Sequence, residues 1–190
     1  FCDRAILLDS GTMVEDGPVN RVVSDYLMTG MGKTAHQQWP ELESAPGNEC
    51  VRLLSVRVID AKGKTAQWID MRRRVGIEIT FRILKKQMRF VPAIVVHAEN
   101  GLQILNALDT STQWREPLEG GDYQSIAWIP GNLLNEGPLV VSVYLMDVLS
   151  YSTKPAKLAA SQEAVAFQVV DSETGPSAKG DYPQHWRAAI

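Results

Sequence analysis

The sequence predicts an all-β protein, namely an antiparallel β-sandwich of the immunoglobulin-like or jelly-roll kind, preceded by a short hairpin and a helix. Three observations lead to this prediction. Short segments of alternating apolar and polar residues follow one another after residue 50, turn signals rich in glycine, proline and asparagine separate them, and no helical periodicity lies between them. Strands in such a series bury their apolar faces by packing two antiparallel sheets together.

Seven segments have the character of strands. The clearest is 75–83, where the odd positions are apolar whereas Glu78, Thr80 and Arg82 are polar, so we expect the odd positions to face the core. Asn100-Gly101 between two apolar runs predicts a hairpin. The expected strands are 51–60, 75–84, 92–99, 102–109, 123–129, 139–148 and 163–170.

The same alternation predicts which side chains point away from the core. In 139–145 the odd positions are wholly aliphatic, so Tyr144 is expected to point outward, and similar reasoning places His97 and Asn106 outward. Together with the polar positions of 75–83, one outward face is expected to carry His97, Asn106, Tyr144, Glu78 and Arg82.

Residues 1–30 form a separate small unit. Residues 5–8 and 12–14 have strand character, and a helix with one apolar stripe is expected from Pro18 until Gly30. A hairpin and one helix are too small to bury their own apolar faces, so this unit is interpreted as the end of a larger domain. We expect it to dock on the sandwich or on a neighbouring chain.

The remainder divides into three regions. A linker is expected over 31–49, where periodicity is absent and Pro40 and Pro46 occur. The sandwich itself is expected over 50–171. Residues 172–190 follow as a C-terminal tail that carries Trp186, and such an extension suits exchange with a second protomer.

Composition argues against several functional classes. The net charge is −3 and basic residues are mixed with acidic ones, so no nucleic-acid partner is expected. Cys2 and Cys50 have no Cys or His at metal-ligand spacing, which predicts no metal site and fits a reduced, cytoplasmic setting. The motifs of phosphate loops, serine hydrolases and zinc peptidases are absent, so no catalytic residues are predicted.

Two stretches resemble one known family. The opening Phe1-Cys2-Asp3-Arg4, followed by an apolar strand and Gly17-Pro18, resembles the closing segment of an ABC-transporter nucleotide-binding domain. The later part is similar to the C-terminal domain of Wzt-type subunits of O-antigen exporters. Its matching features are Asn100-Gly101, Ile129-Pro130, Glu136-Gly137-Pro138 before Val141-Ser142-Val143, and Gly180-Asp181-Tyr182 with Trp186.

The resemblance implies a non-catalytic carbohydrate-binding module at the cytoplasmic face of the bacterial inner membrane. Such a module recognises the terminally modified end of a lipid-linked O-antigen polysaccharide and couples it to export. ATP and Mg would belong to the parent protein, so no cofactor is expected in this part. The implied partners are the O-antigen polysaccharide, the transmembrane permease subunit and a second copy of the chain in a homodimer.

Sugar recognition calls for hydrogen-bonding side chains and for aromatic faces that stack on pyranose rings. Trp114 follows a polar loop, and an aromatic residue beside a loop indicates a sugar-binding role. It could equally act as a lid over the core edge. Trp68 and Trp128 are assigned to the core. The predicted carbohydrate-binding residues are His97, Asn106, Thr110, Trp114, Arg115, Tyr144 and Arg82, the arginines being suited to a charged modification.

Two alternatives stay open. The domain could instead dimerise the ATPase subunits or dock them onto another protein, chiefly through residues 172–190. More remotely, Glu78, Glu99 and Asp109 could supply the pair of carboxylates that a glycosidase requires. Sequence spacing does not place those carboxylates together, and fold analogy alone does not support catalysis.

Overall fold

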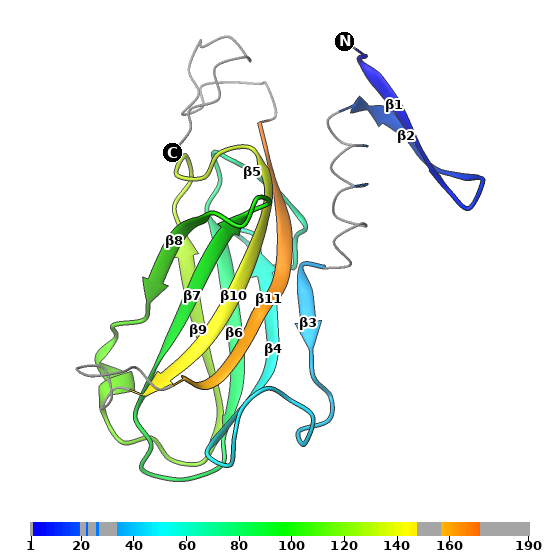
Figure 1. Cartoon of the computed structure of the whole chain (residues 1–190). Coiled ribbons are helices and arrows are strands. Elements are labelled where there is room, and N and C mark those ends of the chain that lie inside the picture. Colours follow the sequence, from blue (N-terminus) through cyan, green and yellow to red (C-terminus); the bar gives the residue numbers. More distant parts are fainter. Residues whose placement is uncertain (1, 20–21, 23–25, 27–33, 148–156, 172–190) are drawn as a thin grey trace.

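Two β-sheets pack face to face in this computed structural model, which describes residues 2–19, 22, 26, 34–147 and 157–171 (Figure 1). One sheet has five strands in the order β5-β11-β10-β7-β8 and the other has four in the order β3-β4-β6-β9. The chain thus forms the predicted all-β sandwich.

The five-stranded sheet combines strands from both ends of the sandwich sequence. β7 (Phe90–Ala98) and β8 (Gln103–Leu108) form a hairpin, and β10 (Gly137–Asp147) and β11 (Lys157–Val170) pair antiparallel beside it. β5 (Trp68–Asp70) lies at the edge and pairs in parallel with β11.

The four-stranded sheet is wholly antiparallel. β4 (Val51–Ile59) and β6 (Val75–Ile83) are its central strands, and β3 (His36–Gln38) and β9 (Gly121–Ile129) are its edges. All seven strands expected from the sequence are present, whereas β3 and β5 were not predicted. Each of these two has only three residues, which is too short to show a period.

The core lies between the inner faces of the two sheets, as the alternation predicts. In β6, Ile77 and Phe81 are fully buried, and across the core so are Val141, Val143 and Leu145 of β10. Burying one such side chain stabilises the fold by roughly 1.5–3 kcal/mol.

The expected Asn100-Gly101 hairpin joins β7 to β8. Gly101 has φ +79°, a left-handed conformation that glycine adopts without steric cost. Its N–H donates to the Ala98 carbonyl at 2.9 Å, and the Ala98 N–H donates to the Leu102 carbonyl at 2.9 Å. This turn sets the register that brings β8 to the edge of its sheet.

The segment expected as a linker is ordered against the sandwich over its described part. β3 pairs with β4, Ala35 and Ala45 are buried, and Trp39 packs partly buried on the core. Residues 34–49 therefore supply β3, one of the four strands of this sheet.

The N-terminal hairpin is confirmed as β1 (Arg4–Asp9) and β2 (Thr12–Pro18). The expected helix after Pro18 falls largely on residues outside the described part. Among the described residues, docking of the hairpin on the sandwich is not observed, because β1 and β2 join neither large sheet and four of their large apolar side chains are exposed. These are Ile6 (57%), Leu8 (63%), Met13 (59%) and Val14 (60%).

The expectation of one shared polar face is wrong. Glu78 and Arg82 lie on the outer face of the four-stranded sheet, where Glu78 is paired with Arg57 and Arg82 with Asp122. His97, Asn106 and Tyr144 lie on the outer face of the five-stranded sheet. Alternation tells on which side of its own strand a residue lies, but it does not tell which sheet the strand joins.

Candidate functional site: a cleft at the open edge of the sandwich

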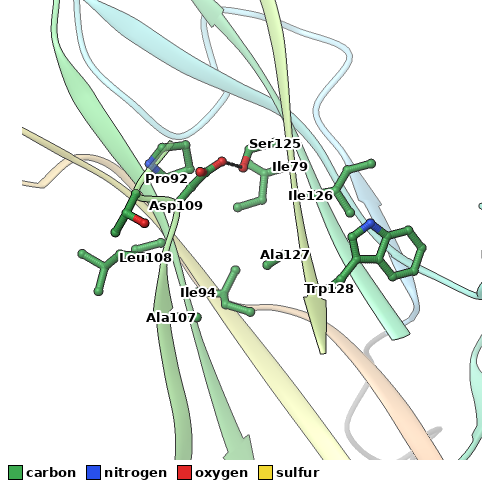
Figure 2. A pocket seen from close by; sticks show the side chains of 12 residues that line it. Ile79, Pro92, Ile94, Ala107, Leu108, Asp109, Ser125, Ile126, Ala127 and Trp128 are labelled. Carbon is green, nitrogen blue, oxygen red and sulfur yellow. Dashed lines mark hydrogen bonds between the residues drawn. The ribbon is translucent and has the colours of Figure 1, made fainter. Parts of the chain in front are cut away.

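A cleft of about 290 Å³ opens between the edge strands β8 and β9, which are not paired with each other (Figure 2). Its floor is apolar and is made by Ile79 of β6 and Ile94 of β7. Beside this floor, each edge strand places a small residue at an inward position, Ala107 in β8 and Ala127 in β9. Because alanine does not fill the space that a valine or leucine would occupy, the edge stays open. We call this site the edge cleft.

One end of the edge cleft is polar. The carboxylate of Asp109, just beyond β8, accepts a hydrogen bond from Ser125 Oγ at 2.7 Å and another from the Ser111 N–H at 3.1 Å. Ser125 points inward from β9 and is buried, so its hydrogen bond joins the two sheets across the cleft (Figure 2). Thr110, which the sequence predicted as a binding residue, also lines the cleft and is exposed.

The environment of Asp109 keeps its carboxylate ionised. Burial raises the pKa of Asp109, but hydrogen bonds from Ser111 and Ser125 outweigh that effect and bring the pKa below its ordinary value. The indole N–H of Trp114 acts in the same direction, although its geometry falls short of a hydrogen bond. The edge cleft therefore presents a fixed negative charge at neutral pH.

This pKa shift predicts a pH-dependent contribution to stability. A carboxyl whose folded-state pKa lies below the unfolded value, roughly 3.9 for Asp, stabilises the fold above that pH, and the contribution is lost as the pH falls through the folded-state pKa. We expect Asp109→Asn to be less stable than the unmodified chain at neutral pH. Urea unfolding of both proteins should show this difference shrinking below about pH 4; a difference independent of pH would contradict the prediction.

The outer rim of the cleft carries exposed apolar side chains. Ile126 and Trp128 leave β9 on its outer side and are 37% and 39% exposed (Figure 2). The guanidinium of Arg74 lies 4.3 Å from the centroid of the Trp128 ring. Opposite Trp128 in the register is Gly76, where an added Cβ would lie 3.0 Å from the indole. The prediction that Trp128 belongs to the core is therefore wrong: this indole is at the surface.

The predicted pair His97 and Tyr144 shares a sheet face but is not brought together. Tyr144 is opposite Ala93 in the register, four residues from His97 along β7, which corresponds to about 13 Å. Lys157 Nζ lies 4.2 Å from the centroid of the Tyr144 ring. Asn106 is exposed on the neighbouring strand β8. A role of these three residues in binding stays a prediction.

The other predicted residues are dispersed. Trp114 is only 1% exposed and packs among core aromatic rings, so the structure supports its interpretation as a lid over the core edge. Arg82 forms an exposed ion pair with Asp122, and both residues lie on the four-stranded sheet, away from His97 and Tyr144. The side chain of Arg115 lies outside the described part of the structure.

The carboxylates considered for glycosidase chemistry do not converge. Glu78 lies on the outer face of the four-stranded sheet, Glu99 follows the far end of β7, and Asp109 lies in the edge cleft beside the start of that strand. Within the described residues, no group of His, Cys, Asp and Glu is arranged to hold a metal ion. The described part also contains no helix that is long and apolar enough to cross a bilayer.

Sequence reasoning missed the edge cleft as a site. Asp109 and Ser125 are distant in sequence, and only the pairing of strands into two sheets brings them together. One signal was available: Ser125 and Ala127 occupy inward positions of a strand whose outward positions are Ile126 and Trp128. A strand with small inward and large outward residues indicates an incompletely filled core edge.

Comparison with known proteins supports the fold and gives the family. A family model described as the Wzt C-terminal domain matches residues 43–180, which is most of the chain. Among solved structures, the crystal structure of the C-terminal domain of wzt is similar, with a TM-score of 0.60, 14% sequence identity, and coverage of 82% of this chain and 95% of that chain. No curated protein matches. The chain belongs to the Wzt C-terminal domain family and is therefore a component of a polysaccharide ABC exporter.

Proposed function

We propose that this chain recognises the end of a lipid-linked O-antigen polysaccharide without cleaving it, and that the terminal sugar binds in the edge cleft. The observation that carries the proposal is the combination within one cleft of an apolar floor and a carboxylate held by Ser125 and Ser111. Family membership supports this class of ligand, and the geometry of the cleft supports this location for the site.

The size of the edge cleft suits one sugar ring. Its volume of about 290 Å³ lies at the lower end of the range for small-molecule sites, roughly 300–1,000 Å³. An apolar floor contacts the C–H face of a pyranose, and the carboxylate of Asp109 accepts hydrogen bonds from ring hydroxyls. Trp128 stands at the outer rim of the cleft, where its indole can pack against the next sugar of the chain.

The placement of carboxylates supports binding without cleavage. Hydrolysis of a glycosidic bond requires two carboxyl groups roughly 5–10 Å apart, one of them acting as an acid. Among the described residues that line the edge cleft, Asp109 is the one carboxylate, and its lowered pKa does not suit a proton donor at neutral pH.

The test is calorimetric titration of the chain with polysaccharide from its own source strain, in native and terminally trimmed forms. We expect saturable binding of the native form and loss of binding after trimming. Asp109→Asn and Trp128→Ala should each weaken binding by about tenfold or more. The first removes a charged hydrogen-bond acceptor and the second an aromatic contact, and we expect either loss to cost roughly 1.5–3 kcal/mol of binding free energy.

Two variants on other surfaces act as matched controls. Tyr144→Ala removes an aromatic side chain from the outer face of the five-stranded sheet, and Arg82→Ala removes an ion pair from the opposite face. Both should bind as the unmodified chain does. Weakened binding in Tyr144→Ala together with unchanged binding in Asp109→Asn would move the site to the face first predicted from the sequence.

The wider setting of this function is also a proposal. The parent protein binds ATP and Mg through a nucleotide-binding domain, works as a homodimer with a transmembrane permease, and acts at the cytoplasmic face of the inner membrane. Dimerisation as the main role of the domain would rest on residues 172–190, which lie outside the described part.

A further inference from the structure

We infer that the edge cleft selects a sugar unit that carries no negative charge and presents a deoxy carbon or an alkyl substituent to the apolar floor. This inference rests on the proposed function and names the class of ligand for the same site. It differs from the expectation, drawn from the sequence, that Arg82 or Arg115 pairs with a charged modification.

The charge of the edge cleft argues against an anionic ligand. Asp109 is ionised, and among the side chains that the structure describes, no Lys, Arg or His lines the cleft. A phosphate, sulfate or uronate bound there would lie close to a like charge in a partly buried site, where water screens the repulsion poorly.

The cations around the described site do not offset this charge. Arg82 is engaged with Asp122, and its guanidinium lies on the outer face of the four-stranded sheet. Arg74 stacks on Trp128, which leaves β9 on the side away from the floor. Among the described side chains, an anionic group would therefore find a cation outside the cleft and not within it.

The floor adds a preference for apolar substituents. Ile79 and Ile94 are 2% and 1% exposed, and Ala107 and Ala127 flank them from the two edge strands. A hydroxyl placed on this floor would lose its hydrogen bonds to water without gaining a partner, whereas a methyl group gains by burial. The position of the ligand that faces the floor is thus expected to be a methyl or a deoxy carbon.

The experiment uses sugars that differ only at carbon 6. The unmodified chain is titrated with the 6-deoxy sugars of the gluco, manno and galacto series, with the parent hexoses, and with the corresponding hexose 6-phosphates and uronic acids. We expect at least one 6-deoxy sugar to bind at millimolar concentration and to bind about tenfold or more tightly than its own phosphate and uronate. The parent hexose should fall between them.

Two variants separate charge from structure. Asp109→Asn removes the negative charge and should reduce the discrimination against the phosphate by about tenfold. Ser125→Ala removes the hydrogen bond but keeps the charge, so the discrimination should persist. In methyl-labelled protein, the chemical shifts of Ile79 and Ile94 should change when the 6-deoxy sugar is added. Asp109→Asn should weaken the affinity for the sugar that is measured from these shifts.

The possible failures are distinguishable. A phosphate or uronate that binds as tightly as its deoxy counterpart would overturn the inference while leaving binding in the edge cleft intact. The inference would also be overturned if no 6-deoxy sugar bound while the native polysaccharide still bound and Asp109→Asn still weakened that binding. This result would leave the proposed function standing. If the polysaccharide itself does not bind, both the inference and the proposed function fail.

Discussion

Replacing Trp114 with alanine is expected to lower the free energy of unfolding by about 3–5 kcal/mol, the usual cost of truncating a large buried aromatic residue. The indole is 1% exposed and lies between aromatic rings of both sheets. Its ring centroid is 5.7 Å from that of Phe81, 6.2 Å from that of Phe90 and 6.3 Å from that of Tyr123. Alanine would leave a cavity that these rings cannot close without moving the sheets.

The matched control is Trp128→Ala, because Trp128 is the same residue type at 39% exposure. Its truncation should cost about 1 kcal/mol or less, as is usual for exposed positions. Urea denaturation followed by circular dichroism measures both variants. Equal losses of stability in the two variants would contradict the placement of Trp114 in the core and Trp128 at the surface.

Gly131→Ala is the second change with a large expected effect. A Cβ at Gly131 would lie 2.2 Å from the carbonyl oxygen of Arg72 and 2.6 Å from its carbonyl carbon. These are backbone atoms, so no side-chain rotation relieves the clash. The adjacent Asn132 N–H donates to the Met71 carbonyl at 2.6 Å, which holds the two loops together. We expect a loss of about 3 kcal/mol or more, the upper range for overpacking.

Gly120→Ala is the control for this substitution. A Cβ at Gly120 would meet only the carbonyl oxygen of Ile83 at 3.6 Å, an ordinary contact, and this glycine is not in the left-handed region. Its midpoint of thermal unfolding should stay within a few degrees of the unmodified chain. If Gly131→Ala were as stable as Gly120→Ala, the close approach of the two loops in the structure would be wrong.

The fold was predictable because its strands are regular. In β6 every second residue from Val75 to Ile83 is apolar and buried, and this pattern is visible without any tertiary information. The hairpin at Gly101 was equally visible, since its turn chemistry is local. What could not be predicted is which strands share a sheet, because pairing depends on contacts between residues far apart in the chain.

The candidate site was predictable only in part. Thr110, predicted as a binding residue, lines the edge cleft two positions after the last residue of β8, but its role in binding stays a prediction. Trp128 was assigned to the core and is at the surface, whereas for Trp114 a binding role and a lid over the core edge were both left open, because a tryptophan beside a loop and one in a strand give no local sign of burial. Asp109 and Ser125 come from different sheets, so their hydrogen bond has no signature in the sequence.

The parallel pairing of β5 with β11 bears on how the chain folds. Trp68, Ile69 and Asp70 are held beside Gln168, Val169 and Val170, about one hundred positions later, and Arg72 reinforces the junction through Asp171 at 3.1 Å. Contacts between such distant segments form slowly, because the loop-closure entropy is lost before the contacts stabilise the chain. During synthesis the five-stranded sheet cannot be completed before β11 emerges. Until then the apolar inner face of the nascent sandwich stays open, and it is a surface on which a chaperone can act.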